Sequence, residues 1–292
     1  MPVQNTIMKR VDLHMHTTFS DGSYTPDELI RYAKEKNLDV VAVTDHDTVT
    51  SHAECKQAAA KYGIELIPGI EISCQFEPGT LHILGYFLDP SDSKLAKRLE
   101  ELQKARAERN PMIIDRLNRM GLKITLEEVI AKSGGDQVGR PHFAQVLIEK
   151  GYVRNNDEAF KKYLGKGASA YIDKRRFSAK DGIDMIREAG GVAVVAHPKQ
   201  LKVSDRSRLK ELFTEWKSLG LGGIEAYSSC QDKKEQKFWH ELADEMDLVA
   251  TGGSDFHGKN KPDVDLGWMG NDVTIGYDVV ERMKHEAGSH KS

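Results

Sequence analysis

Val40-Val41-Ala42-Val43-Thr44-Asp45-His46-Asp47 places three ionisable side chains directly after an apolar segment. A continuous run of Val and Ala is typical of a strand buried on both faces, as in parallel sheets covered by helices. Charged groups at the end of such a strand are costly to bury unless a partner compensates them. In parallel α/β proteins the carboxyl ends of the strands form the ligand-binding edge. We therefore expect this segment to be a parallel strand that carries functional residues at its end.

The same pattern recurs along the chain, because short apolar segments alternate with helical ones. The other expected strands are Glu65–Ile67, Leu81–Leu84, Val192–Ala196, Gly223–Ala226 and Leu248–Ala250. Helices are expected from the capping box Thr25-Pro26-Asp27-Glu28 to Asn37, and over 51–62, 178–190, 206–219 and 233–246. Repeated strand–helix units predict an α/β fold with a parallel sheet, either open or closed into a barrel.

Residues 91–170 interrupt this alternation, because they contain helical patterns and no convincing strand. One charged helix is expected from about Lys94, with an interruption near Pro111. Further helices are expected over Leu126–Lys132, Pro141–Lys150 and Asp157–Leu164. The prediction is an α/β body formed by 8–90 and 171–288, with 91–170 as a helical insertion or cap.

Composition excludes several classes of protein. The 292 residues carry a formal net charge of −3, which argues against a strongly basic nucleic-acid coat. Cys55, Cys74 and Cys230 have no CxxC spacing, so a disulfide framework or thiolate zinc site is not expected. No apolar run is long enough to span a membrane. We expect a cytoplasmic protein with no membrane association and no obligate protein partner.

Histidines and carboxylates concentrate on or just after the expected strands. His14 and His16 are two residues apart, so on an extended backbone their side chains point the same way. The full set of candidate metal ligands is His14, His16, Asp21, His46, Glu71, His82, His197, Asp255 and His257. Imidazole and carboxylate donors without thiolate suit Mn²⁺, Zn²⁺ or Fe²⁺. Because this set exceeds the needs of one ion, two or three divalent ions are expected, with Mn²⁺ favoured.

The motifs that contain these residues resemble the successive motifs of the PHP (polymerase and histidinol phosphatase) family of metal-dependent phosphoesterases. They are Asp12–His16, Thr44–Asp47, Gly69–Glu71, Ala196–Pro198 and Gly253–His257. The resemblance implies a distorted, TIM-like (β/α)7 barrel with a metal cluster at its mouth, held by the nine candidate ligands. It also implies a bridging role for Glu71.

Gly139-Arg140-Pro141-His142 is similar to a signature of one subgroup of that family. This subgroup contains phosphatases that act on nucleoside 3′,5′-bisphosphates, some of which degrade short RNA from the 5′ end. The resemblance implies hydrolysis of the 3′-phosphate by a metal-bridging hydroxide, held by Glu71, Asp255 and His197. Two alternatives stay open: a histidinol-phosphate type of phosphatase, and a non-catalytic PHP module that binds nucleic acid.

Residues around the expected metal centre receive supporting roles. Asp12 and Asp45 are interpreted as partners that orient the ligand imidazoles, or equally as simple strand-end caps. Substrate contacts are expected from Arg140, His142, Lys174 and Arg176. Arginine suits bidentate phosphate binding, although the basic run 174–176 could also be solvated surface. The charged stretch 94–109 is interpreted as the solvated face of a helix, and contact with RNA stays open as an alternative.

Overall fold

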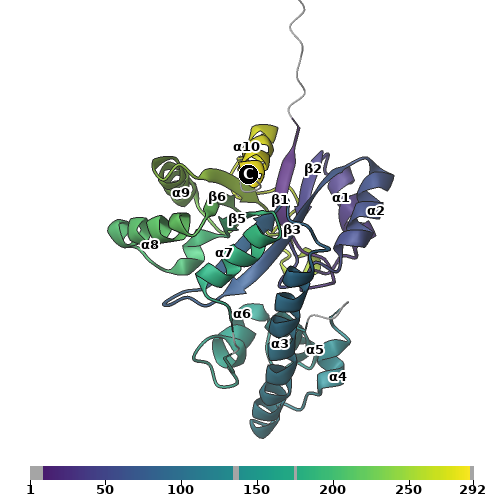
Figure 1. Ribbon diagram of the computed structural model, residues 1–292. Coiled ribbons are helices and arrows are strands. Elements are labelled where there is room, and N and C mark those ends of the chain that lie inside the picture. Colours follow the sequence, from purple (N-terminus) through teal and green to yellow (C-terminus); the bar gives the residue numbers. More distant parts are fainter. Residues whose placement is uncertain (1–8, 134–137, 174–175, 290–292) are drawn as a thin grey trace, which may run out of the picture.

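The computed structural model describes residues 9–133, 138–173 and 176–289, and Figure 1 shows one sheet with helices around it. Seven strands pair in the order of the sequence. They are β1 (Val11–Met15), β2 (Val40–Val43), β3 (Glu65–Cys74), β4 (Leu81–Tyr86), β5 (Val192–Val195), β6 (Leu221–Ser228) and β7 (Val249–Gly253).

The end of β1 meets the segment after β7, so the sheet curls into a nearly closed barrel. The backbone N–H of His16 donates to the carbonyl of Phe256 at 3.0 Å, and that of Asp255 donates to His14 at 2.9 Å. Three clusters of buried apolar side chains fill the barrel and its contacts with the helices. The predicted α/β barrel is confirmed.

One strand runs against the expected direction. β4 pairs antiparallel with both β3 and β5, whereas the other neighbouring pairs are parallel. The expectation that all strands are parallel is therefore wrong for β4. A parallel neighbour needs a long crossover, usually helical, and residues 75–80 between β3 and β4 are too few to form one. The sequence also places the end of β3 too early, because this strand continues through Glu71.

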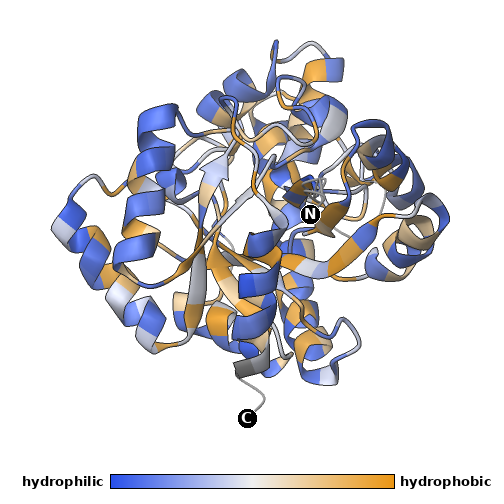
Figure 2. Cartoon of the chain, turned by 90° about the horizontal axis from the view of Figure 1, so that it is seen from above, coloured by the Kyte–Doolittle hydropathy of each residue, from blue (hydrophilic) through white to orange (hydrophobic). Residues whose placement is uncertain are grey.

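Helices cover the outside of the barrel and turn hydrophilic faces outward (Figure 2). They are α1 (Pro26–Glu35), α2 (His52–Tyr62), α7 (Ala179–Glu188), α8 (Arg206–Ser218), α9 (Lys233–Glu245) and α10 (Tyr277–Ser289). The capping box at Thr25 and Glu28 is present, with Pro26 in the first turn. The sequence predicts all of these helices except α10. Among the described residues, no helix combines the length and the apolar character that crossing a membrane would require.

The helical segment between β4 and α7 extends from the mouth of the barrel (Figure 1). It contains α3 (Ser93–Arg119), α4 (Leu126–Ile130), α5 (Arg140–Glu149), α6 (Asn156–Ala159) and the π-helix η1 (Phe160–Leu164). Its buried side chains form a core of their own. We call this segment the insertion; its boundaries at residues 91 and 170 stay a prediction.

The predicted interruption of the first insertion helix near Pro111 is wrong, because α3 continues through this residue. The amino-terminal half of α3 packs Leu95 and Leu99 into the barrel core. Its carboxyl-terminal half packs Ile113 and Leu117 into the core of the insertion. Packing at both ends holds the helix together across a residue that lacks the backbone N–H. As a result α3 joins the barrel to the insertion.

Candidate metal centre and adjoining arginine pocket

The structure brings the nine predicted metal ligands together at the mouth of the barrel. They form four overlapping groups in which one donor atom per residue lies within 4.8 Å of the others. The groups are His16, Asp21, His46 and His257; His14, His16 and Asp255; His14, Glu71 and His197; and His46, Glu71 and His82. The overlap between groups is the arrangement that neighbouring ions with shared ligands would require.

Glu71 lies at the middle of this arrangement and is fully buried. Its Oε1 atom is 2.8 Å from Nδ1 of His82 and 2.9 Å from Nε2 of His197. Its Oε2 atom is 3.0 Å from Nδ1 of His46. Nε2 atoms of His14 and His16 are each 3.3 Å from the same oxygen. A carboxylate with imidazoles around both oxygens is placed to bridge two ions.

The reversed direction of β4 explains how His82 reaches this cluster. His82 is the second residue of β4, so it lies at the amino end of its strand. Because β4 is antiparallel to its neighbours, this end lies at the same edge as the carboxyl ends of the parallel strands. The sequence-based prediction of His82 as a ligand assumed a parallel strand. Because β4 is antiparallel, His82 reaches the cluster from the amino end of its strand instead.

The electrostatics of the cluster favour carboxylates and a mixture of neutral and charged imidazoles. Burial lowers the pKa of His46 to about 3, despite the attraction of Glu71 and Asp21. Burial also opposes charge on His257, but the carboxylates of Asp21 and Asp255 together outweigh it and raise its pKa to about 9. Burial works against the ionised form of Glu71 too, yet the surrounding imidazoles hold its pKa well below the usual range.

Several polar atoms in the cluster lack a hydrogen-bond partner among the described residues. Nε2 of His16, Oδ1 of Asp21 and Nδ1 of His46 are buried, and although each lies within 3.3 Å of a group of the cluster, none of these contacts has the geometry of a hydrogen bond. Unpartnered buried polar atoms are costly and rare in native proteins, so each calls for an explanation such as a bound ion. Nitrogen and oxygen donors without thiolate fit borderline divalent cations. The residues present therefore fit a cluster of divalent ions.

Asp12 and Asp45 are buried, and in the described part of the chain their carboxylates accept hydrogen bonds from backbone N–H and hydroxyl groups rather than from imidazoles. Asp12 accepts hydrogen bonds from the backbone N–H groups of His14, Ser254 and Gly267 at 3.2, 2.9 and 2.8 Å. Asp45 instead binds polar groups of residues near the cluster. It accepts from Thr17, Ser20 and Ser51 at 2.5–2.8 Å. Both carboxylates thus fix the loops that carry the ligands, which is closer to the strand-end interpretation.

Glu225, rather than Asp12 or Asp45, is placed to orient the imidazole of His14, and the sequence did not reveal this contact. Its Oε1 atom lies 2.8 Å from Nδ1 of His14, and Oε2 accepts from the backbone N–H of His197 at 2.6 Å. This contact leaves Nε2 of His14 to face Glu71 at 3.3 Å, where it could bind an ion. The available signal was a single acidic residue within the apolar strand Gly223–Ala226, because a carboxylate there needs a partner.

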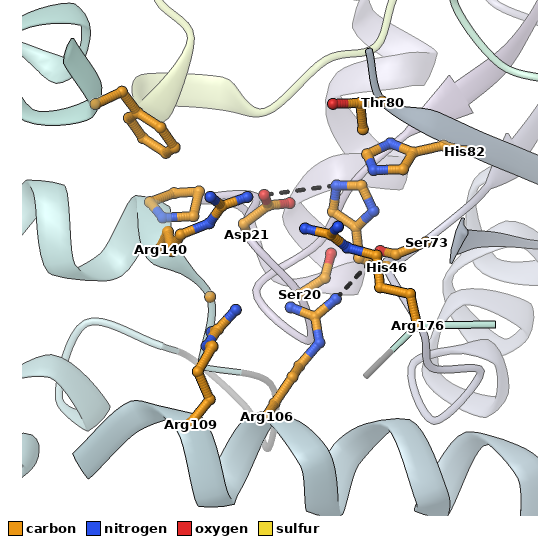
Figure 3. Close-up of a pocket in the computed structure, with 13 residues that line it drawn as sticks. Ser20, Asp21, His46, Ser73, Thr80, His82, Arg106, Arg109, Arg140 and Arg176 are labelled. Atoms are coloured by element: carbon orange, nitrogen blue, oxygen red, sulfur yellow. Dashed lines mark hydrogen bonds and ion pairs between the residues drawn. The ribbon is translucent and has the colours of Figure 1, made fainter. Parts of the chain in front are cut away.

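Four arginines line a pocket directly beside the cluster (Figure 3). Arg106, Arg109, Arg140 and Arg176 line this pocket together with Asp21, His46 and His82. The first two project from α3, so the interpretation of 94–109 as a solvated face is wrong for these two residues. Arg109 is only 5% exposed. Lys174, predicted beside Arg176 as a substrate contact, lies outside the described residues.

Two of the four guanidinium groups in this pocket have a carboxylate partner in the described part of the chain, namely Arg106 with Asp47 and Arg176 with Asp173 at 3.4 Å. Nη2 of Arg106 pairs with Asp47 and also donates to Oγ of Ser73 at 3.4 Å. Burial, and to a smaller extent the neighbouring arginines, lower the pKa of Arg109 to about 9. Mutual repulsion of this kind is relieved when an anion binds. The pocket is therefore suited to a phosphate group.

The remaining two predicted substrate contacts, Arg140 and His142, separate in the structure. Arg140 donates to the carbonyl of Leu164 at 3.0 Å and faces the pocket at the start of α5. His142 is 1% exposed, and its Nδ1 accepts from the backbone N–H of Gly139 at 3.0 Å. His142 caps its own helix and is absent from the described lining of the pocket, so the structure gives no support to a substrate contact.

The barrel, the donor set and the adjoining cationic pocket define an enzyme of the metal-dependent phosphoesterase class. The chain belongs to the PHP domain family, which matches residues 12–219. This match covers the barrel from β1 through α8 and the whole insertion. The resemblance inferred from the sequence motifs is confirmed.

Relatives with assigned activities match over most of the chain. A 5′-3′ exoribonuclease of Haemophilus influenzae is 35% identical over 249 residues, which is 85% of this chain and 90% of that protein. A 3′,5′-nucleoside bisphosphate phosphatase of Chromobacterium violaceum is 32% identical over 261 residues, covering 89% and 91%. A solved structure of an amidohydrolase from Chromobacterium violaceum, with bound sulfate and no metal, aligns with a TM-score of 0.85 at 30% identity. It covers 94% of this chain and 96% of that one.

Proposed function

We propose that the protein removes the 3′-phosphate from nucleoside 3′,5′-bisphosphates and also shortens small RNAs from the 5′ end. The observation that carries this proposal is a pocket lined by two chemically different sets of side chains, which we call its two walls. One wall is formed by Asp21, His46 and His82 of the metal cluster, and the other by arginines. Relatives named for each of the two activities support it.

The metal wall would take the phosphate that reacts. The nine clustered side chains would hold two or three divalent ions, with Mn²⁺ favoured and Glu71 between them. Such ions lower the pKa of bound water and neutralise the oxygens of the phosphoryl group. Glu225 would hold His14 in the tautomer that presents Nε2 to the ions, and Asp12 would fix the backbone that carries His14.

The arginine wall would take the second phosphate of the substrate. Guanidinium groups bind phosphate through paired N–H donors, and they stay charged at neutral pH. Arg106 is held in place by Asp47, and Arg140 is held by the carbonyl of Leu164. A 5′-phosphate on this wall would leave the 3′ side of the same nucleotide facing the metal wall.

This arrangement accounts for both proposed activities, because each of them breaks the bond between phosphorus and the 3′ oxygen. In a bisphosphate, hydrolysis splits phosphorus from the 3′ oxygen and releases inorganic phosphate. In a short RNA, the same attack at the first linkage releases a 5′-mononucleotide and leaves a 5′-phosphate on the shortened chain. The new 5′-phosphate can occupy the arginine wall in the next cycle.

The histidinol-phosphate alternative is disfavoured by the charge of the pocket. A phosphorylated amino alcohol carries a cationic amine, and the arginine wall would repel it. A purely structural PHP module has no need for a complete set of metal-binding side chains. The arrangement of the four overlapping donor groups supports catalysis instead.

Replacing Arg140 by Ala tests the second-phosphate role. We expect kcat/KM for adenosine 3′,5′-bisphosphate to fall about 10- to 100-fold, because a charge-assisted contact contributes roughly 1.5–3 kcal/mol. Hydrolysis of adenosine 3′-monophosphate should change little. Arg119→Ala is the control, since Arg119 is exposed on α3 and pairs with Asp115. Equal losses on both substrates would contradict the assignment.

We also infer a cytoplasmic location and a small phosphorylated substrate, without an obligate protein partner. Cys55, Cys74 and Cys230 are free thiols, which supports a reducing compartment. Fractionation of cells that produce the protein would test the location, and recovery with the envelope fraction would contradict it.

A further inference from the structure

Asn260 connects the insertion to the rim of the metal centre. It ends the short helix η3 (Gly258–Asn260), which follows the candidate ligand His257. Its Nδ2 donates to the backbone carbonyl of Asp21 at 2.9 Å, and its Oδ1 accepts from Nε2 of Gln145 at 2.6 Å. Its own backbone carbonyl accepts from Nδ2 of Asn156 at 3.2 Å. One residue thus binds a candidate ligand loop and two helices of the insertion.

The partner helix α5 also carries an arginine of the pocket. Arg140 is the first residue of α5 and Gln145 lies further along the same helix. Because a short helix moves as a rigid unit, the contact between Gln145 and Asn260 also restrains Arg140. Asn260 therefore links the position of a pocket guanidinium to that of Asp21 in the metal cluster.

A second contact between the insertion and the barrel comes from α3, and it is an ion pair instead of a hydrogen bond between neutral side chains. Arg106 of α3 pairs with buried Asp47, whose backbone N–H donates to the carbonyl of Glu71 at 2.9 Å. That pair uses an arginine that itself lines the pocket. Gln145 and Asn260 are neutral and are not among the side chains that line the pocket. Their contact can therefore be removed without deleting a group that faces the substrate.

We propose that Asn260 and Gln145 are positioning residues that set the distance between the arginine wall and the metal wall. This distance determines the preference for a substrate whose two phosphates are one nucleotide apart. The inference rests on the proposed function. A substrate that engages both walls needs them at a fixed separation, whereas a monophosphate engages only the metal wall. Preorganisation of two binding groups benefits only the ligand that uses both.

Gln145→Met tests this directly, because Met keeps the length and packing of the side chain but cannot donate to Asn260. The measurement is kcat/KM for adenosine 3′,5′-bisphosphate divided by kcat/KM for adenosine 3′-monophosphate, together with metal content. We expect the ratio to fall about 2- to 10-fold, the effect of roughly one hydrogen bond. Turnover of the monophosphate and metal content should stay unchanged.

Two further variants separate positioning from general stability. Asn156→Ala removes the second hydrogen bond to Asn260, and it should lower the same ratio. Asn118→Ala is the control, because Asn118 makes comparable hydrogen bonds to Ile124 but only within the insertion. This control should leave the ratio at the wild-type value.

The outcomes distinguish the inference from the function on which it rests. A wild-type protein that shows no preference for the bisphosphate overturns both. A wild-type preference that survives in Gln145→Met and Asn156→Ala overturns the positioning role alone. Equal losses on the two substrates, or an equal loss in Asn118→Ala, also overturn it, since either result shows general destabilisation.

Discussion

The two walls of the pocket are built in different ways. The metal wall is the part of the metal cluster that lines the pocket, and it lies in front of Glu71 and His14, which are fully buried on their strands. The arginine wall consists of long side chains, most of them from the helices of the insertion. Under the proposed function, the barrel would hold the groups that act on the reacting phosphate, and the insertion would hold most of the groups that select the substrate. Substitutions in the two walls should separate catalysis from specificity.

The largest effect is expected from Glu71→Gln, at the centre of the metal cluster behind the metal wall. The amide keeps the size of the side chain but loses the charge that faces the surrounding imidazoles. We expect kcat to fall at least about 100-fold on both mono- and bisphosphate, in the range seen for loss of one electrostatic group in an active site. Metal content, measured by elemental analysis, should fall with it.

Glu65→Gln is the matched control, because Glu65 lies on the same strand β3 but pairs with Lys9 at the exposed end. Its activity and metal content should match those of the wild type. Retention of full metal content and turnover in Glu71→Gln would contradict the assignment of metal binding and catalysis to this cluster.

A smaller effect is expected from Glu225→Gln, which acts behind the metal wall. Gln keeps one acceptor but removes the charge beside Nδ1 of His14. We expect the dissociation constant for Mn²⁺ to rise about 10- to 100-fold, as is typical when the partner of a metal-binding histidine is changed. Competition with a chelating dye measures this constant. Exposed Glu241→Gln on α9 serves as the control, and an unchanged constant in Glu225→Gln would contradict the orienting role.

The smallest effect is the release of a proton from the metal cluster when metal binds, which the arginine wall should not influence. In the metal-free protein the pKa of His257 is about 9, raised above its ordinary 6.5. Its charged form stabilises the metal-free fold fully below pH 6.5, and this contribution is lost as the pH rises through 9. Metal binding requires a neutral imidazole, so Mn²⁺ should displace a proton from His257 at pH 7.

Calorimetric titration of the metal-free protein with Mn²⁺, in buffers of different ionisation enthalpy, measures this release. Apparent affinity should increase from pH 7 towards pH 9. Heat that is independent of the buffer would show that no proton leaves the centre. Arg140→Ala should release the same number of protons as the wild type, because Arg140 belongs to the other wall.

The metal wall could be predicted because the topology of the fold leaves it little freedom. Strand ends in an α/β barrel converge on one rim, so residues such as His46 and His197 meet although they are distant in sequence. The direction of β4 could not be derived from its apolar pattern, which is the same for either direction. Glu225 was missed because the apolar residues around it were taken to describe the whole strand.

The arginine wall could be predicted only in part, because a helix has several faces and packing selects among them. The charges of 94–109 give no sign that Arg106 and Arg109 turn inward, while Glu108 between them stays exposed. That choice depends on α3 packing against both the barrel and the insertion. His142 shows the same difficulty, since a histidine near a helix start can cap the helix or face a ligand.

Diffraction from crystals grown with Mn²⁺ and a non-hydrolysable analogue of adenosine 3′,5′-bisphosphate tests the central claim most directly. Anomalous scattering at the manganese edge locates the ions without reference to the coordinates of the chain. We expect two or three peaks around Glu71, with the 3′-phosphorus beside them and the 5′-phosphorus among Arg106, Arg140 and Arg176. A lone ion, or an analogue bound with its 5′-phosphate away from these arginines, would contradict the account.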